Sequence, residues 1–287
     1  MYYLNSPQEF ISSVFALTVK DGDTCSDISE LRNRYIDFAV SLGGEAVRPS
    51  NISDSYCYKE DRILSLISKY KDYSQLTDIE TDTSETSHRS RVNAMKAVNE
   101  GRKHLKKSDN ELGSLLDFAI HTMFYHRSKE SGGGSVSSAP GVIWCSPRLN
   151  WTKEDMAEFL VHELAHNMIF IDERRYQHYI DFDEIAKPDN YAKSAILMKP
   201  RPLDKVFHSL IVSNEVLSYR MKHGEPVNPN VHPGTQKMYD AALETTDTIR
   251  ELLKRKTLVT PRFLELMDKV ETSLEAIKNA NNLKAAA

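Results

Sequence analysis

Three side chains that could do metal chemistry lie close together in the sequence, at His162, Glu163 and His166. Histidines four residues apart share one face of an α-helix, one turn from each other, so both imidazoles can bind a single ion from the same side. Glu163 is then placed beside the ion, next to the two ligands rather than among them. We therefore expect a metal held by His162 and His166.

The residues around this motif are typical of a buried helix. Thr152 can cap its start with Asp155 three residues later, and the helix is predicted to run to about Ile171. Apolar residues on both sides of the motif would seat it in a core: Phe159, Leu160, Val161, Met168, Ile169 and Phe170. The alternative is a pair of core histidines that only form hydrogen bonds. Burying His, Glu and His without an ion, however, leaves many polar groups to satisfy.

Two histidines do not complete a metal site, so a third ligand must come from another segment. A second helix is predicted from Pro202 to about His223, where Gly224 ends it. On that helix His208 and Glu215 are seven residues apart and share a face, so either could reach the metal. The spacing alone does not choose between them.

Two blocks of the sequence resemble the HExxH-type peptide β-hydroxylases, which depend on iron and 2-oxoglutarate and modify ribosomally made peptides. The first block is residues 158–166, EFLVHELAH, and the second is Pro-Arg-Pro-Leu at 200–203 followed by His208. The resemblance spans about residues 141–220. It implies an Fe(II)- and 2-oxoglutarate-dependent oxygenase that hydroxylates a side chain of a peptide. It also implies that His208 is the third ligand, with Glu215 beside the ligands rather than among them.

An arginine is the expected partner of the co-substrate. Three protein ligands leave positions on the iron for the keto acid and dioxygen. The far carboxylate of 2-oxoglutarate commonly pairs with a guanidinium, because the two groups match in a bidentate pair. Arg201 is the candidate and Arg220 the reserve. The alternative for Arg201 is a surface arginine at the start of a helix.

A zinc metallopeptidase is the rival interpretation. In that class Glu163 would activate a zinc-bound water and Glu215 would be the third ligand, with the same two histidines. A binding module with a structural metal is a third possibility, which the intact motif disfavours. The identity of the metal, and whether His208 or Glu215 touches it, would distinguish the classes.

The remaining patterns predict a mostly helical α+β protein with a small β-sheet beside the motif helix. The short apolar run Val142–Cys145 is the predicted strand, and residues 77–91 and the glycine-rich residues 131–141 are predicted loops, the second a boundary or mobile. We expect an N-terminal helical region over 1–130 and a metal-site region with C-terminal helices over 131–287, together forming one compact unit. Helices are predicted from Pro7, between Asp27 and Gly43, around Ile63–Ile67, and over Arg91–Lys107, Leu112–His126, Thr235–Lys254 and Pro261–Lys278.

Composition narrows the class of protein. The 287 residues contain 40% hydrophobic and 27% charged residues, with a net charge of −4, as in ordinary globular proteins. No basic stripe for nucleic acid is visible, and residues 102–107 are interpreted as a solvated helix face. Three widely spaced cysteines suit a reducing compartment, and no long apolar segment is present. We expect a cytoplasmic enzyme with a peptide partner, without nucleic acid or membrane, whose oligomeric state the sequence leaves open.

Overall fold

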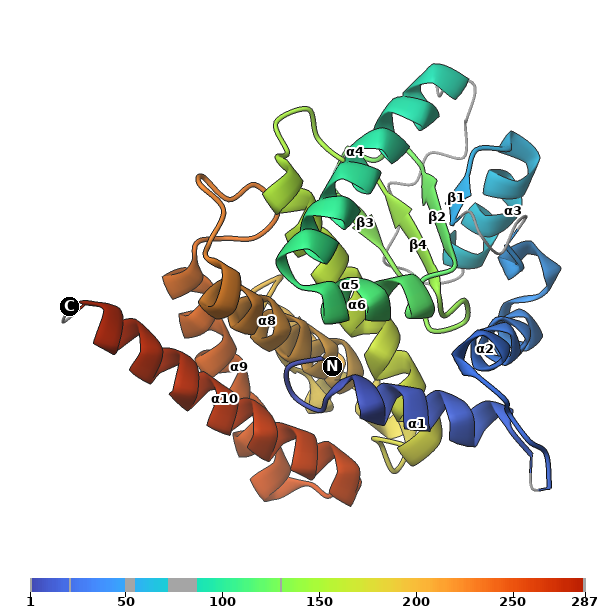
Figure 1. The fold of residues 1–287 in the computed structure, drawn as a ribbon. Helices are drawn as coiled ribbons and strands as arrows, with labels where there is room; N and C mark the ends of the chain where they lie inside the picture. Colours follow the sequence, from blue (N-terminus) through green and yellow to red (C-terminus); the bar gives the residue numbers. More distant parts are fainter. Residues whose placement is uncertain (1, 21, 50–54, 72–86, 130, 286–287) are drawn as a thin grey trace. The chain divides into compact units, whose positions relative to one another are not determined.

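The computed structural model describes residues 2–20, 22–49, 55–71, 87–129 and 131–285. Helices dominate it, accompanied by a four-stranded mixed sheet and a two-stranded sheet, which confirms the predicted fold class (Figure 1). The chain divides into two compact units, residues 7–171 and residues 2–6 with 172–285. The long helix α6 (Lys153–Tyr176) begins in the first unit and ends in the second.

The first unit is built on the four-stranded sheet, whose order is β1-β2-β4-β3. Strands β1 (Tyr56–Cys57), β2 (Thr122–Tyr125) and β4 (Val142–Cys145) are parallel, and β3 (Gly133–Gly134) runs antiparallel to β4. The predicted strand at 142–145 is confirmed. The glycine-rich segment, expected to be a loop, contains the edge strand β3.

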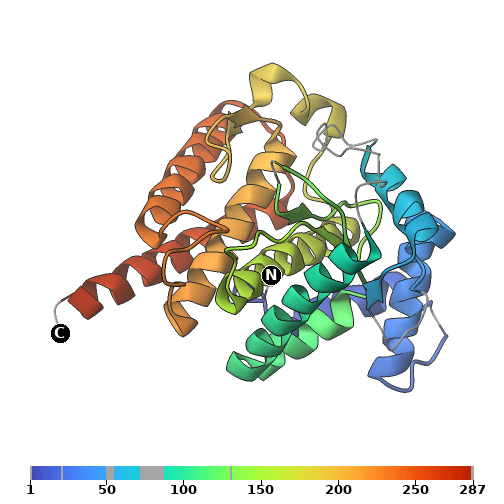
Figure 2. The same cartoon turned by 90° about the horizontal axis from the view of Figure 1, so that it is seen from above.

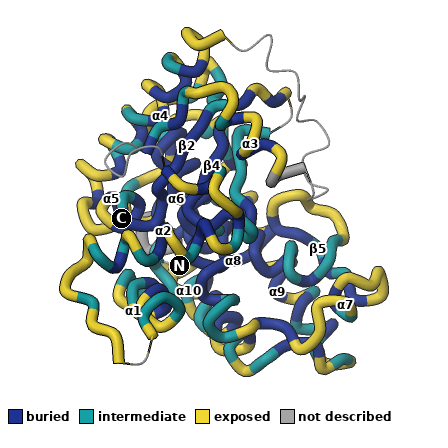
Figure 3. The backbone as a smooth tube through the Cα atoms, turned by 90° about the vertical axis from the view of Figure 1, so that its right-hand side faces the viewer, coloured by how far each residue is buried: buried dark blue, intermediate teal, exposed yellow. Residues whose placement is uncertain are grey.

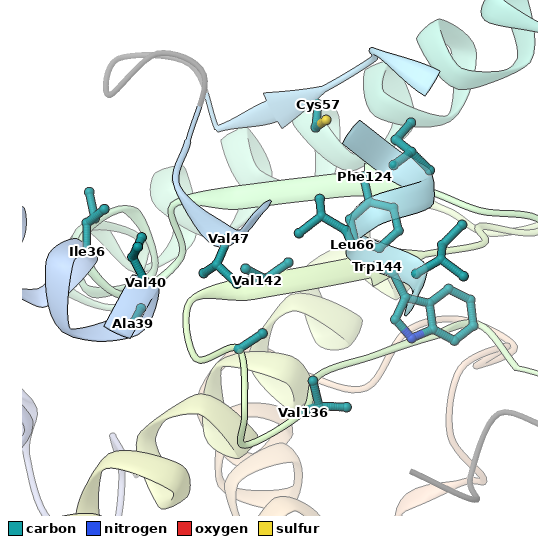
Figure 4. Packing of buried hydrophobic residues seen from close by; sticks show 13 residues of the cluster. Ile36, Ala39, Val40, Val47, Cys57, Leu66, Phe124, Val136, Val142 and Trp144 are labelled. Atoms are coloured by element: carbon teal, nitrogen blue, oxygen red, sulfur yellow. The ribbon is translucent and has the colours of Figure 1, made fainter. Parts of the chain in front are cut away.

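One face of this sheet is covered by α2 and α3. Phe124 of β2 lies opposite Trp144 of β4 in the register, and both are fully buried in one cluster (Figure 4). The cluster also contains residues of α2 (Ile28–Gly43), the short helix η1 (Glu45–Val47) and α3 (Glu60–Lys71), namely Ile36, Ala39, Val40, Val47, Ile63, Leu66 and Ile67. Because side chains alternate across a strand, the neighbours of Phe124 and Trp144 point to the other face.

That other face carries α4 (His88–Ser108) and the first part of α6. Helix α4 packs against β2 and against α5 (Asn110–Ala119). A Cβ at Gly101 of α4 would lie 2.3 Å from Met156 of α6, and a Cβ at Gly133 would lie 2.3 Å from Phe159 of α6. These glycines therefore allow α4 and β3 to approach the motif helix closely.

Local signals predicted both ends of α2 and the start of α1 in this unit. Asp27 caps α2 by accepting hydrogen bonds from the amides of Ser29 and Glu30, and Gly44, with a φ of 80°, follows its last residue. Helix α1 (Pro7–Thr18) starts at the predicted proline. The predicted loop over 77–91 lies mostly outside the described residues, and its last four residues begin α4.

The helix predicted over Leu112–His126 is wrong in its second half. Helix α5 ends at Ala119, and residues 122–125 form β2 in the middle of the sheet. The run Ile-His-Thr-Met-Phe-Tyr fits a buried strand as well as a helix, and pairing with β1 and β4 decides the outcome. His121 accordingly lies in the core, with its ring nitrogens 3.1 Å from Thr122 Oγ1 and 3.2 Å from the carbonyl of Pro140.

The second unit is a group of helices around α8 (Leu203–His223), which packs against α9 (Thr235–Arg255) and α10 (Pro261–Ala285) (Figure 2). The rings of Phe207 and Phe263 stack at 3.9 Å between α8 and α10. The unit also contains α7 (Phe182–Ile185), η2 (Pro188–Asn190) and the hairpin of β5 (Ala192–Lys193) with β6 (Pro200–Arg201). The predicted helices at the C-terminal end are confirmed, and α8 ends before Gly224 as predicted.

Neither unit has a helix, among its described residues, that is long and apolar enough to cross a membrane. The basic residues of α4 are used at its surface. Arg102 and Lys106 both pair with Asp117 of α5, and Lys103 pairs with Glu100. This arrangement agrees with a solvated helix face.

Candidate functional site

The motif helix α6 starts as the sequence predicted. The amide of Thr152 donates to Asp155 Oδ2 at 2.9 Å, and the amide of Asp155 donates back to Thr152 Oγ1 at 3.1 Å. This reciprocal pair fixes the first turn. The helix continues to Tyr176, five residues beyond the predicted end.

His162 and His166 are the two partly exposed residues in the central stretch of this helix. Every other residue from Asp155 to Asp172 is buried, whereas these two are partly exposed. Figure 3 shows α6 as a helix that is buried over much of its length. Their ring centroids are 4.9 Å apart, with the planes at 65°. The four-residue spacing therefore places two imidazoles side by side at the two partly exposed positions of the otherwise buried stretch 155–172.

Glu163 lies next to this pair inside the first unit, and it is only 2% exposed. Its Oε2 accepts a hydrogen bond of 2.7 Å from the hydroxyl of Ser135, and its Oε1 is 3.8 Å from His162 Nε2. Burial raises the pKa of Glu163 to about 8, and the hydrogen bond from Ser135 opposes that rise. A carboxyl group in this setting can hold or take up a proton near neutral pH.

Asn167 ties Glu163 to the glycine-rich segment. Its Nδ2 donates to Ser135 Oγ at 3.0 Å and to the carbonyl of Glu163 at 2.8 Å, while its Oδ1 accepts from the amide of Gly141 at 2.6 Å. Sequence reasoning missed both Ser135 and Asn167. The four-residue spacing from Glu163 to Asn167 was a usable signal, whereas Ser135 is 28 residues from Glu163 and left none.

His208, the third ligand implied by the resemblance, lies on α8 in the second unit and is buried. Its Nε2 is 3.9 Å from Oε2 of Glu173. Burial raises the pKa of Glu173 to about 7. Glu173 is seven residues after His166 on α6, and therefore on the same face of that helix.

Glu215, the other candidate ligand, holds the N-terminal segment of the chain. Its Oε2 accepts from the amide of Tyr3 at 3.0 Å and its Oε1 from the amide of Leu4 at 3.1 Å. Both carboxylate oxygens are therefore engaged with backbone groups. The side chain is 1% exposed, and burial raises its pKa while these amides oppose the rise.

The two candidate arginines differ in how strongly the surrounding structure engages them. Arg220 is 3% exposed, and its Nη1 donates to the carbonyl of Pro233 at 2.8 Å and to Glu225 Oε1 at 3.3 Å. It therefore ties together the segment between α8 and α9. Arg201 is half-buried on β6, where burial lowers its pKa and the charge of Asp204 opposes that change.

The structure thus brings His162, Glu163 and His166 together and describes His208, Arg201, Arg220 and Glu215 within the other unit. Among the described residues, no group of three or more His, Cys, Asp or Glu side chains is arranged to hold a metal ion. The third ligand stays a prediction. A scan against protein-family models and a search of curated protein sequences both gave no match to this chain.

The residues present fit a metal bound through α6. Two adjacent, partly exposed imidazoles in a buried stretch of α6 offer two nitrogen donors on one side. Such donors suit iron and zinc alike. The set His162–Glu163–His166 can therefore bind a divalent ion and move a proton beside it.

Proposed function

We propose that this chain is an Fe(II)- and 2-oxoglutarate-dependent hydroxylase that modifies a side chain of a ribosomally made peptide in the cytoplasm. The observation that carries the proposal is the accessible pair His162 and His166 beside the buried Glu163. The likeness of the Arg201–His208 block to the peptide β-hydroxylases supplies the reaction class. Bound Fe(II), with 2-oxoglutarate, supplies the activation of dioxygen.

Each residue of the site has a proposed task. His162 and His166 bind the iron, and His208 is the proposed third ligand. Arg201 binds the far carboxylate of 2-oxoglutarate through its guanidinium. Glu163, held by Ser135, keeps one oxygen toward His162 and would hold or release a proton at that oxygen.

The zinc peptidase alternative has weaker support. It shares the two histidines and Glu163, but it requires Glu215 as the third ligand. Both oxygens of Glu215 already accept hydrogen bonds from the amides of Tyr3 and Leu4. Arg220 is likewise a weaker candidate than Arg201 for the keto acid, because its guanidinium holds Glu225 and Pro233.

The test is the mass of a peptide after incubation. The purified chain is loaded with Fe(II) and incubated in air with 2-oxoglutarate and the peptide encoded next to its gene. Hydroxylation adds one oxygen atom to the peptide and releases succinate in equal amount. Cleavage of the peptide without succinate would instead support the peptidase.

Glu163→Gln separates the two classes further. Gln retains the shape of the side chain, and Glu163 is not a ligand in either class of enzyme. The variant should therefore keep its metal. A peptidase loses its general base and nearly all of its rate. An oxygenase keeps part of its turnover, because its oxidant is made from dioxygen and the keto acid. Loss of the metal in this variant would show that Glu163 is a ligand.

A further inference from the structure

The outer edge of β3 has the geometry of a site for an extended peptide. β3 is the last strand in the order β1-β2-β4-β3, so no described strand pairs with its far side. In the register with β4, Gly134 lies opposite Trp144, and the carbonyl of Gly132 accepts from the amide of Ser146 at 2.7 Å. Because hydrogen-bonded pairs alternate along an antiparallel ladder, Gly133 directs its N–H and C=O outward.

The hydroxyl of Ser131 occupies the position of a partner strand at this edge. Ser131 Oγ donates to the carbonyl of Gly133 at 3.0 Å and accepts from its amide at 3.5 Å. An antiparallel partner residue would likewise exchange two hydrogen bonds with one residue of the edge. The hydroxyl of Ser131 therefore forms one normal and one long hydrogen bond with the backbone groups of Gly133. A peptide backbone can replace both bonds.

Three described residues before the edge, Ser128, Lys129 and Ser131, are held by one arginine. The guanidinium of Arg148 donates through Nη2 to the carbonyls of Lys129 and Ser131, at 3.0 and 3.1 Å, and through Nη1 to the carbonyl of Ser128. Gly133 itself packs on Phe159 of α6 without room for a Cβ atom. A preformed edge lowers the entropy that a peptide must lose to bind.

Ser135 connects this edge to the reactive residues. Ser135 directly follows the last residue of β3, and its hydroxyl bonds Glu163 of α6 at 2.7 Å. Because the alternation of β3, continued by one residue, repeats every second residue, we expect the backbone groups of Ser135 to face the same edge as those of Gly133. Directly opposite residues of an antiparallel pair project their side chains to the same face, with Cβ atoms about 5 Å apart. A peptide residue opposite Ser135 thus directs its side chain toward Glu163 and His162.

We propose that the substrate peptide binds as an antiparallel strand along the outer edge of β3, displacing the hydroxyl of Ser131. The residue opposite Ser135 is the one that is modified. The peptide residue two positions later pairs with Gly133. This proposal rests on the proposed function for the class of substrate, and it adds how the peptide is held and which of its residues reaches the site.

The test is a series of substrate peptides, each with one backbone N-methyl group, assayed with the iron-loaded chain. A methyl group on the amide of the modified residue, or of the residue two positions later, removes a bond to the edge. Each should lower kcat/KM about 10- to 100-fold. A methyl group on the amide between them points away from the edge and serves as the matched control, with an effect within about 3-fold.

Hydrogen–deuterium exchange resolved to single amides gives a readout that does not depend on turnover. Adding the unmodified peptide should slow exchange at Gly133 and Ser135 and leave the amide of Gly134 nearly unchanged. If the peptide is hydroxylated but N-methylation shows no alternation and Gly133 gains no protection, the edge proposal is overturned while the hydroxylase proposal stands. If Gly133 and Ser135 gain protection but no oxygen is added, the edge proposal holds and the proposed reaction fails. If the peptide gains no oxygen and the amides of Gly133 and Ser135 gain no protection, both the edge proposal and the hydroxylase proposal are overturned.

Discussion

Glu163 and Glu215 are both buried carboxyl groups on long helices, yet their surroundings differ. Glu163 receives one side-chain hydrogen bond, from Ser135, and its other oxygen lies 3.8 Å from His162. Glu215 receives backbone amides from Tyr3 and Leu4 on its two oxygens. Fixed backbone partners on both oxygens indicate a role in stability, whereas an oxygen facing an accessible imidazole indicates a role in chemistry.

The largest effect is expected for Glu215→Ala. The change leaves the amides of Tyr3 and Leu4 without their acceptor and opens a cavity in the second unit, so the free energy of unfolding should fall by about 3–5 kcal/mol. The fraction of chain that remains folded should bind iron as well as wild type does. Urea unfolding and iron content measured together check this. A stable, iron-free Glu215→Ala variant would make Glu215 a ligand and reverse the comparison.

Arg220 and Arg201 show the same contrast between a residue held for stability and a residue available for chemistry. Substituting them should give the next largest effect. Arg220→Met should lose about 2–4 kcal/mol of stability, since the carbonyl of Pro233 and the carboxylate of Glu225 lose a buried charged partner. It should leave the requirement for 2-oxoglutarate unchanged. Arg201→Ala is the matched variant and should behave in the opposite way, with stability nearly intact and a roughly 30-fold or greater rise in the 2-oxoglutarate concentration needed. Titration of succinate formation separates them, and an unchanged requirement in Arg201→Ala would move the keto acid to another residue.

Local signals predicted much of this molecule, and long-range contacts account for the rest. Caps and stops such as Asp27, the pair Thr152–Asp155 and Gly224 determine helix ends within a few residues, so the sequence showed them directly. Strand β2 was mistaken for helix because its pairing partners lie far away in the chain.

At the candidate site too, local spacing was predictable from the sequence and long-range contacts were not. The four-residue spacing of His162 and His166 predicted their common face on one helix, with Glu163 beside them. The hydroxyl that Ser135 offers to Glu163 and the amides that Tyr3 and Leu4 offer to Glu215 arise only from folding, because 28 and more than 200 residues separate the partners. Such contacts leave no periodic signal in a single sequence.

A smaller, pH-dependent effect is expected at His121, a buried histidine far along the sequence from the motif. Burial lowers its pKa to about 3, below the value of about 6.5 in an unfolded chain. The unfolded state therefore binds the proton first as the pH falls. The stability that neutral His121 contributes is complete above about pH 6.5 and is lost toward pH 3, by at most about 1.4 kcal/mol per pH unit.

His121→Asn removes this titration and should flatten the fall in stability between pH 6 and about pH 4 relative to wild type. Urea unfolding at several pH values measures the difference. Parallel pH profiles in the two proteins would show that His121 is already protonated in the folded state or does not change its charge on unfolding.

The central claim is that His162 and His166 hold the metal, and the most direct test is metal content after loading with Fe(II) without oxygen and removal of loosely bound ions. Wild type and the control His104→Ala, which removes a histidine on α4, should each retain one ion per chain. His162→Ala and His166→Ala should retain almost none, because loss of one ligand from three weakens binding greatly while the helix stays folded by circular dichroism. Full occupancy in either of these two variants would contradict the assignment of the metal to α6.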